Sequence, residues 1–214
     1  MTDTGRISIV ASWYAETKTH IPQKQRRPIM TKRIAVLVAD GAEPIETIAP
    51  MDAWRRGGID VESVSIANAY VTLAHEIRIE ADAVISDVAL EEYDGILIPG
   101  GSAGVDNLRA CPEVLTAIRQ CMDADKFVFA ICAGPMVLND AGVLKGRRVT
   151  CYPGCETEFP SGAYIGESGI AVDGNLVTAS GPAFALDFGL TCLEVMTGKA
   201  NADKVAADML VNRA

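Results

Sequence analysis

Histidine is scarce in this chain of 214 residues, which contains only two, His20 and His75. Aromatic residues make up 6% of the sequence, and no apolar run approaches the roughly 18 residues that a transmembrane helix needs. Basic residues are the minority among charges, with 19 Lys and Arg against 28 Asp and Glu and a net charge of −9. We therefore expect no membrane span and no nucleic-acid partner, because phosphate backbones are bound by basic surfaces.

The charge is unevenly distributed along the chain. Residues 1–29 contain five basic and two acidic residues, so the remaining 185 residues contain 14 basic and 26 acidic residues, a net charge of −12. The first segment lacks the apolar core and cleavage site of a secretory signal, and Pro22 and Pro28 interrupt any long helix. We expect a flexible N-terminal extension over 1–29 and a single folded domain over 30–214.

Cysteine is present six times, yet disulfides are not expected. With 49% hydrophobic residues, a domain of this size forms a core that needs no cross-links. Cys151 and Cys155 form an isolated C-x3-C motif, whereas a structural zinc site needs about four ligands. We therefore expect a reduced, cytoplasmic protein without a metal site.

Short apolar runs alternate with helical patterns after residue 32, which is typical of a doubly wound α/β sandwich with a mostly parallel central sheet. The run 33–39 predicts a buried strand, and a helix over 45–54 follows it and ends at Gly57-Gly58. The stretch 71–79 predicts a small hairpin or edge structure. We expect further strands over 59–66, 95–98, 126–131, 148–151, 170–172 and 176–178, and further helices over 102–108, 112–122, 135–139, 183–196 and 200–211.

Small residues follow three predicted parallel strands, at Gly41-Ala42, at Gly100 and Gly101, and at Cys132 and Ala133. Ligands bind at the carboxyl ends of such strands, where small residues let backbone N–H groups approach closely. Cys132 lies where a strand turns into a helix, as in a nucleophile elbow, and the helix N-terminus favours its thiolate. The N–H groups of Gly101 and Ala133 are candidates for an oxyanion hole. An ordinary buried cysteine is the alternative interpretation.

Two kinds of base are available to Cys132 in the predicted domain. His75 is its single histidine, but it lies in the irregular stretch, where a lone histidine is more often a solvated surface residue than a base. Glu43 and Glu46 follow the first strand, and Glu46 lies about one helical turn further on, where it can point back over the site. Both are also ordinary acidic residues of a first helical turn. A carboxylate is therefore the better candidate.

Four segments, in this order, resemble the ThiJ/PfpI superfamily, and within it the branch of the parkinsonism-associated protein deglycase. They are Gly41-Ala-Glu-Pro-Ile-Glu46-Thr, Leu97-Ile-Pro-Gly-Gly101, Ala130-Ile-Cys132-Ala-Gly-Pro135 and Ser180-Gly-Pro182. The resemblance covers about residue 32 to the end and implies a flavodoxin-like, class I glutamine amidotransferase-like fold and a homodimer. It also implies a reactive Cys132 hydrogen-bonded to Glu46, and an anion pocket lined by Gly100, Gly101 and Ala133.

Two positions depart from the family's pattern. Many members have His-Pro where this chain has Tyr152-Pro153, so a histidine proton shuttle is absent there. A tyrosine is a poor base at neutral pH, although it can donate a hydrogen bond. His75 falls roughly where relatives carry an arginine near the pocket entrance.

The resemblance implies cofactor-independent chemistry on small reactive carbonyls. The first hypothesis is a glutathione-independent glyoxalase or deglycase that acts on methylglyoxal, glyoxal or early carbonyl adducts, with Cys132 as nucleophile and Glu46 as proton carrier. The second is a cysteine-based oxidative-stress sensor or chaperone with little turnover. The third, a cysteine peptidase or amidotransferase-like hydrolase, needs a histidine base and is disfavoured unless His75 reaches Cys132.

Overall fold

The computed structural model describes residues 31–164, 166 and 169–212. The chain divides after Thr31, and the second unit, Lys32–Ala214, is the part considered below. The predicted extension over 1–29 lies outside the described residues. Among the residues described, no helix has the length and apolar character needed to cross a membrane.

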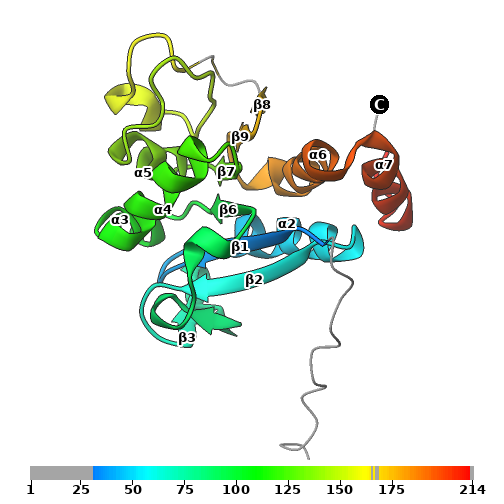
Figure 1. Ribbon diagram of the computed structural model, residues 1–214, viewed down its shortest axis with the longest axis horizontal. Coiled ribbons are helices and arrows are strands. Elements are labelled where there is room, and N and C mark those ends of the chain that lie inside the picture. The colour runs from blue at the N-terminus through cyan, green and yellow to red at the C-terminus, as the bar shows by residue number, and fades with distance from the viewer. Residues whose placement is uncertain (1–30, 165, 167–168, 213–214) are drawn as a thin grey trace, which may run out of the picture. The chain divides into compact units, whose positions relative to one another are not determined.

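A seven-stranded sheet with the order β5-β2-β1-β6-β7-β9-β8 runs through this unit (Figure 1). Its neighbouring strands are parallel except for β8 and β9, which form an antiparallel hairpin at one edge. This confirms the predicted α/β fold with a mostly parallel sheet. The strands are β1 (Arg33–Val38), β2 (Asp60–Ser65), β5 (Ala83–Val84), β6 (Gly95–Ile98), β7 (Phe127–Ile131), β8 (Ile170–Asp173) and β9 (Leu176–Ala179).

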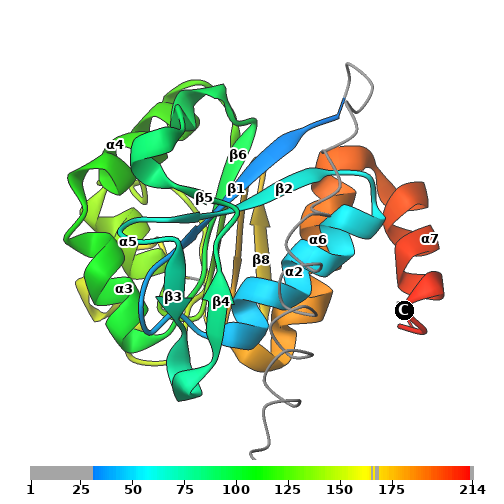
Figure 2. The ribbon, with the colours of Figure 1, turned by 90° about the horizontal axis from the view of Figure 1, so that it is seen from below.

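Helices cover both faces of the sheet (Figure 2). Alternate side chains of β1 enter different cores: Val36 packs with the first set of helices and Leu37 with the second. Strands that are buried on both faces explain the continuous apolar runs of the sequence. The first set is α2 (Pro44–Arg56), α6 (Ala185–Thr197) and α7 (Lys199–Asp208), and the second is α3 (Ser102–Arg109), α4 (Pro112–Asp123) and α5 (Pro135–Asp140).

Trp54 and Gly189 hold α2 against α6. The Trp54 Nε1–H donates to the Gly189 carbonyl over 2.7 Å, and the indole ring lies 5.3 Å from the ring of Phe129 in β7. A Cβ at Gly189 would lie 2.9 Å from the Cα of Pro50, so the two helices need a glycine at this contact. Helix α2, which carries Glu46, is thereby fixed against the sheet.

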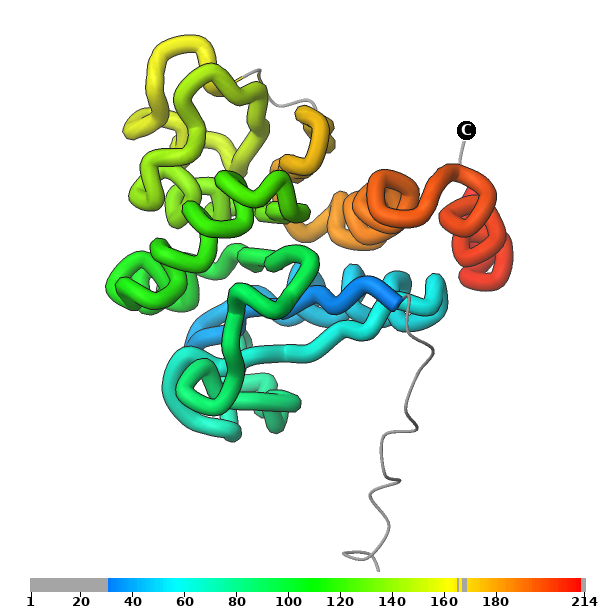
Figure 3. Tube along the Cα trace, viewed as in Figure 1, coloured from blue at the N-terminus to red at the C-terminus, as the bar shows by residue number. Residues whose placement is uncertain are grey.

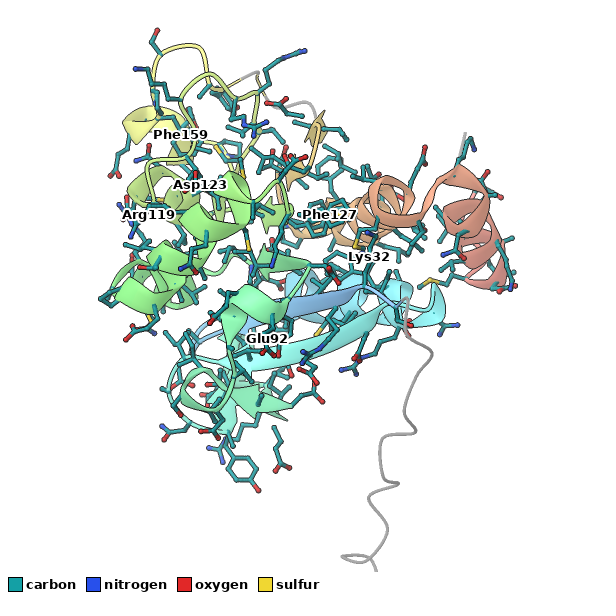
Figure 4. All side chains as sticks on the ribbon, in the orientation of Figure 1. Lys32, Glu92, Arg119, Asp123, Phe127 and Phe159 are labelled. Carbon is teal, nitrogen blue, oxygen red and sulfur yellow. The ribbon has the colours of Figure 1, made fainter. Side chains whose placement is uncertain are left out.

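The amino-terminal ends of the strands are closed by charged and aromatic side chains. Lys32 lies with its Nζ 4.9 Å from the centre of the Phe127 ring (Figure 4). Arg33 stacks on Tyr93 and pairs with Glu62 over 3.0 Å. The carboxyl ends at the opposite side of the sheet are therefore the side left for a functional site.

The predicted hairpin over 71–79 is confirmed as β3 (Tyr70–Thr72) paired with β4 (Arg78–Glu80). Between these strands, a short 3-10 turn over Ala74–Glu76 contains His75.

The predicted strand over 148–151 is wrong. In this region only an isolated bridge joins Val149 to Tyr164, in the irregular stretch that follows α5 (Figure 3). Its backbone groups find partners outside a regular ladder, because the Thr150 N–H donates to the Thr178 hydroxyl over 2.9 Å. The helix expected over 183–196 begins at Ala185 after a 3-10 turn, and the last helix ends at Asp208.

Candidate active site

Cys132 lies between β7 and α5 in a strained backbone conformation. Its φ of +62° falls in the left-handed region, which residues other than glycine rarely adopt. The Cys132 N–H donates to the Ala179 carbonyl over 2.8 Å, and the Cys132 carbonyl accepts the Tyr152 N–H over 2.8 Å. A Cβ at the following Gly134 would lie 2.5 Å from the Ile98 carbonyl oxygen. The small residues after Cys132 thus permit the sharp turn that the sequence predicts.

Glu46 is fully buried in the first turn of α2. Its Oε2 accepts the Gly100 N–H over 2.8 Å, which ties the helix to the end of β6. Its Oε1 is buried and has no hydrogen-bond partner among the described residues. A buried oxygen without a partner is costly, and it is the natural place for a proton or a bound ligand.

Glu43 positions Glu46 rather than reaching the thiol itself. As the N-cap of α2, it accepts the Glu46 N–H on its Oε2 over 2.7 Å. The Glu43 N–H donates to the Gly100 carbonyl over 2.9 Å. Glu43 therefore fixes the first turn of the helix from which Glu46 enters the site.

Gly100 lies where the three segments converge. A Cβ there would be 2.5 Å from Glu46 Oε2 and 2.6 Å from Cys132 Cβ. Gly101 has a φ of +90°, and a Cβ at this position would overlap the Gly41 carbonyl oxygen. Both positions therefore need glycine so that the backbone can approach the carboxyl and the thiol.

The pKa of Glu46 is raised to about 7, mainly by burial and also by the nearby charge of Glu43. The Gly100 N–H and the Cys132 thiol oppose this rise. Burial also raises the pKa of Cys132 to about 12, and the Glu46 carboxyl acts in the same direction. The Ala133 and Gly101 N–H groups lower the pKa of the thiol, but the net shift is upward, the opposite of the direction expected from the helix N-terminus. The pair thus resists carrying two negative charges.

The structure brings together Cys132, Glu46, Gly100, Gly101 and Ala133, as the sequence analysis expects. The N–H groups of Gly101 and Ala133 act on the Cys132 sulfur by lowering the pKa of the thiol, and backbone N–H groups of this kind can donate to an oxygen that forms on an attacked carbon.

His75 is not part of this arrangement. It is exposed, has a φ of +60°, and makes no hydrogen bond to Cys132 within the described part of the chain. The neighbouring Ala74 N–H donates to the Ala42 carbonyl over 2.8 Å, which fixes the turn without directing the imidazole to the thiol. The geometry gives no support to a Cys-His mechanism.

Tyr152 borders a cavity of about 350 Å³ at the carboxyl end of β9. Phe184 also lines this cavity, and the sequence analysis missed it. The Ser180-Gly-Pro182 motif after a parallel strand was the signal that could have pointed to it.

Cys151 and Cys155 do not form a metal site with their neighbours in the described part of the chain. Cys151 is buried, and its Sγ lies 3.9 Å from Glu156 Oε2. Across residues 31–164, 166 and 169–212, no group of three or more His, Cys, Asp and Glu side chains is arranged to hold a metal ion.

A family model described as the DJ-1/PfpI family matches residues 32–195, which include each segment of the thiol site. The chain belongs to the DJ-1/PfpI family. Among relatives, the Parkinson disease protein 7 homolog of Danio rerio is 34% identical over 184 residues, which are 84% of this chain and 97% of that protein. The structure of oxidized DJ-1 from Toxoplasma gondii is similar, with a TM-score of 0.82 and 33% identity over 86% of this chain and all of that one.

Some members of the DJ-1/PfpI family are much longer than the region they share with this chain. The protein DJ-1 homologs B and A of Arabidopsis thaliana are 32% and 33% identical to it, and the matches cover 42% and 47% of those proteins. The chain therefore spans about half the length of these relatives. Membership confirms the resemblance that the four sequence segments indicate.

Proposed function

We propose that this protein is a cofactor-independent enzyme of the glyoxalase or deglycase type, acting on methylglyoxal, glyoxal or early carbonyl adducts. The observation that carries the proposal is the fully buried Glu46 carboxyl next to Cys132, one oxygen of which, Oε1, has no hydrogen-bond partner among the described residues. A carboxyl with a pKa near 7 can both take up and return a proton at neutral pH. A 2-oxoaldehyde needs this two-way proton transfer between its two carbonyl carbons.

The first step is attack of the Cys132 sulfur on the aldehyde carbon. One S–C bond forms, the carbonyl π bond becomes an alkoxide, and the thiol proton passes through Glu46 to that oxygen. The N–H groups of Gly101 and Ala133 donate to the developing negative charge. The product of this step is a hemithioacetal on Cys132.

The second step moves a proton between the two carbons. The Glu46 carboxylate removes the proton from the former aldehyde carbon, which gives an enediolate, and returns it to the neighbouring carbon. The hydroxyl proton on the first carbon passes to the oxygen of the neighbouring carbon. The first carbon is then a thioester, and water hydrolyses it to free the thiol. The balance for methylglyoxal is one substrate plus one water giving one lactate, with no external oxidant or reductant.

The test is the initial rate of methylglyoxal loss without glutathione, for wild type, Cys132→Ser, Glu46→Gln and Cys111→Ser. Cys111 is a half-buried thiol that lies away from the site, so its variant is a matched control. We expect the Cys132 and Glu46 variants to lose turnover by at least about 100-fold, which is the usual effect of removing a nucleophile or its proton carrier. Equal rates in wild type and Cys132→Ser would refute the proposal.

Oxidation sensing is the second candidate, and the partial exposure of Cys132 favours it. A peroxide converts a thiolate to a sulfenic and then a sulfinic acid, and a protonated Glu46 could donate to one of the new oxygens. Intact-mass measurement after mild peroxide, with peptide mapping, distinguishes the two functions. A gain of two oxygens at Cys132 in a protein that does not turn over methylglyoxal would favour sensing.

We also propose that the protein is a homodimer. Ile45 and Ile48 on α2 and Ile77 before β4 are 55%, 45% and 46% exposed, and they surround one apolar hollow with Leu186 and Met209. A second copy would cover this surface, because exposed apolar patches usually mark contact sites. Sedimentation should give a dimer for wild type and a monomer for Ile48→Glu, whereas a monomeric wild type would contradict the proposal.

A further inference from the structure

The cavity that Tyr152 borders has an aromatic character that the proposed reaction leaves unexplained. Tyr152 and Phe184 are exposed by 51% and 38%, and both line the cavity of about 350 Å³ together with Pro182. We call it the aromatic cavity. None of the described residues that line it carries a charge. Exposed aromatic rings around one hollow favour an apolar, flat ligand over a charged one.

Two backbone hydrogen bonds connect the segments that line the aromatic cavity to the backbone of Cys132. The Tyr152 N–H donates to the Cys132 carbonyl over 2.8 Å. The Cys132 N–H donates to the carbonyl of Ala179, the residue before Ser180, over 2.8 Å. Tyr152, in one wall of the cavity, is therefore bonded to Cys132 directly, and Ser180, in the other wall, follows a residue that is bonded to Cys132. The closeness of these walls to the backbone of Cys132 makes the cavity a candidate space for the remaining group of a small molecule bound at the thiol.

Glycines lie next to both aromatic rings of the cavity. A Cβ at Gly169 would lie 2.9 Å from Phe184 Cε1, so the ring rests directly on the backbone of that glycine. A Cβ at Gly181 would lie 3.5 Å from Tyr152 Cδ2, so the absence of a side chain there leaves room in front of the tyrosine ring. The Ser180 hydroxyl is already within 3.1 Å of the Thr150 hydroxyl. The ligand thus meets mainly ring faces and proline.

Resting on the proposed function, we propose that the aromatic cavity binds the organic substituent of a 2-oxoaldehyde, and that Phe184 and Tyr152 select aryl substituents over methyl. A methyl group would leave most of the cavity to water, whereas a phenyl ring would bury apolar surface against both rings. The balanced reaction for phenylglyoxal is one substrate plus one water giving one mandelate. Phe184 is then a specificity-determining residue of the thiol site.

The first test compares kcat/KM for phenylglyoxal and methylglyoxal. For wild type we expect a ratio of about ten or more, after correction for the reactivity of each aldehyde with a free thiol. Phe184→Ala should lower this ratio at least about fivefold, mainly through KM for phenylglyoxal. Val172→Ala, at an exposed position on β8 away from the cavity, should leave it unchanged. An unchanged ratio in Phe184→Ala would overturn the inference.

Gly181→Val provides a second variant in case Phe184→Ala is unstable. Its backbone is extended, so a larger residue fits the conformation, and the new side chain would fill the space before Tyr152. It should slow phenylglyoxal turnover more than methylglyoxal turnover. Equal slowing of both substrates would contradict the cavity's role.

Alkylation of Cys132 separates this inference from the proposed function. Phenacyl bromide and bromoacetone each form one S–C bond and release bromide and a proton, without any turnover. Peptide mapping should show faster labelling of Cys132 by the aryl reagent, relative to free N-acetylcysteine, and loss of this preference in Phe184→Ala. If the preference is found without aldehyde turnover, the proposed function is wrong and the cavity assignment stands. If turnover is found without aryl preference in either assay, the cavity assignment is wrong and the proposed function stands.

Discussion

The burial of Glu46 should make this protein less stable as the pH rises. The pKa of this carboxyl rises from 4.5 to about 7 in the folded chain, mainly because it is fully buried. Between those two pH values the folded state holds a proton that the unfolded state has lost. The free energy of unfolding therefore falls as the pH rises from 4.5 to 7. The stability that the protonated Glu46 contributes is fully present only below pH 4.5.

The magnitude follows from about 1.4 kcal/mol for each pH unit by which the two pKa values differ. For Glu46 this amounts to about 3 kcal/mol lost between pH 4.5 and 7. Glu46→Gln cannot ionise, and its amide retains an oxygen for the Gly100 N–H. The variant should therefore lack this loss and should gain stability relative to wild type as the pH rises.

Urea unfolding at several pH values from 4.5 to 7.5 measures the difference between the two profiles. Cys132→Ser is the matched control, because it keeps the buried carboxyl and should show the same fall as wild type. Parallel profiles for wild type and Glu46→Gln over this range would show that burial does not raise the pKa of the Glu46 carboxyl. The role of Glu46 as a proton carrier at neutral pH would then lose its basis.

Three further substitutions probe the surroundings of the site. Gly100→Ala places a Cβ 2.6 Å from Cys132 Cβ, so turnover should fall by at least about 100-fold while thermal unfolding stays cooperative; near-normal kinetics would contradict the close approach. Trp54→Phe removes the bond to the Gly189 carbonyl and should cost about 2 kcal/mol in urea unfolding; an unchanged midpoint would contradict that contact. Arg109→Met breaks the pair that holds Asp140 at 2.6 Å and should cost about 1 kcal/mol, more at low salt than at high salt.

The carboxyl ends of the strands could be predicted because the sequence features that mark them, an apolar run followed by small residues, are adjacent in the chain. A continuous apolar run such as 33–39 indicates a strand buried on both faces, and the small residues that follow it mark where its backbone meets a ligand. Cys132 and Glu46 could be paired from such positions, since the carboxyl ends of parallel strands lie on one side of a sheet. The scarcity of histidine also pointed away from His75, which the structure leaves exposed.

Other features depend on contacts between distant segments. The stretch 148–151 contains strand-forming residues, but the N–H groups of Arg148, Val149 and Thr150 donate to the Asp173 carboxylate, the Ala163 carbonyl and the Thr178 hydroxyl. Such scattered partners leave no sequence signature. The pKa of Cys132 is likewise set by burial and by Glu46, which outweigh the local helix terminus. The wall formed by Phe184 depends on Gly169, fifteen residues earlier.

Lactate formation is the measurement that tests the central claim most directly. Loss of methylglyoxal also follows when the aldehyde simply adds to lysine, arginine or cysteine side chains, whereas lactate requires proton transfer between its two carbons. Proton NMR on a glutathione-free mixture should show many equivalents of lactate per wild-type chain, and none above background for Cys132→Ser or Glu46→Gln. Lactate formed equally by wild type and Cys132→Ser, or less than one equivalent from wild type, would contradict catalysis by this cysteine–glutamate pair.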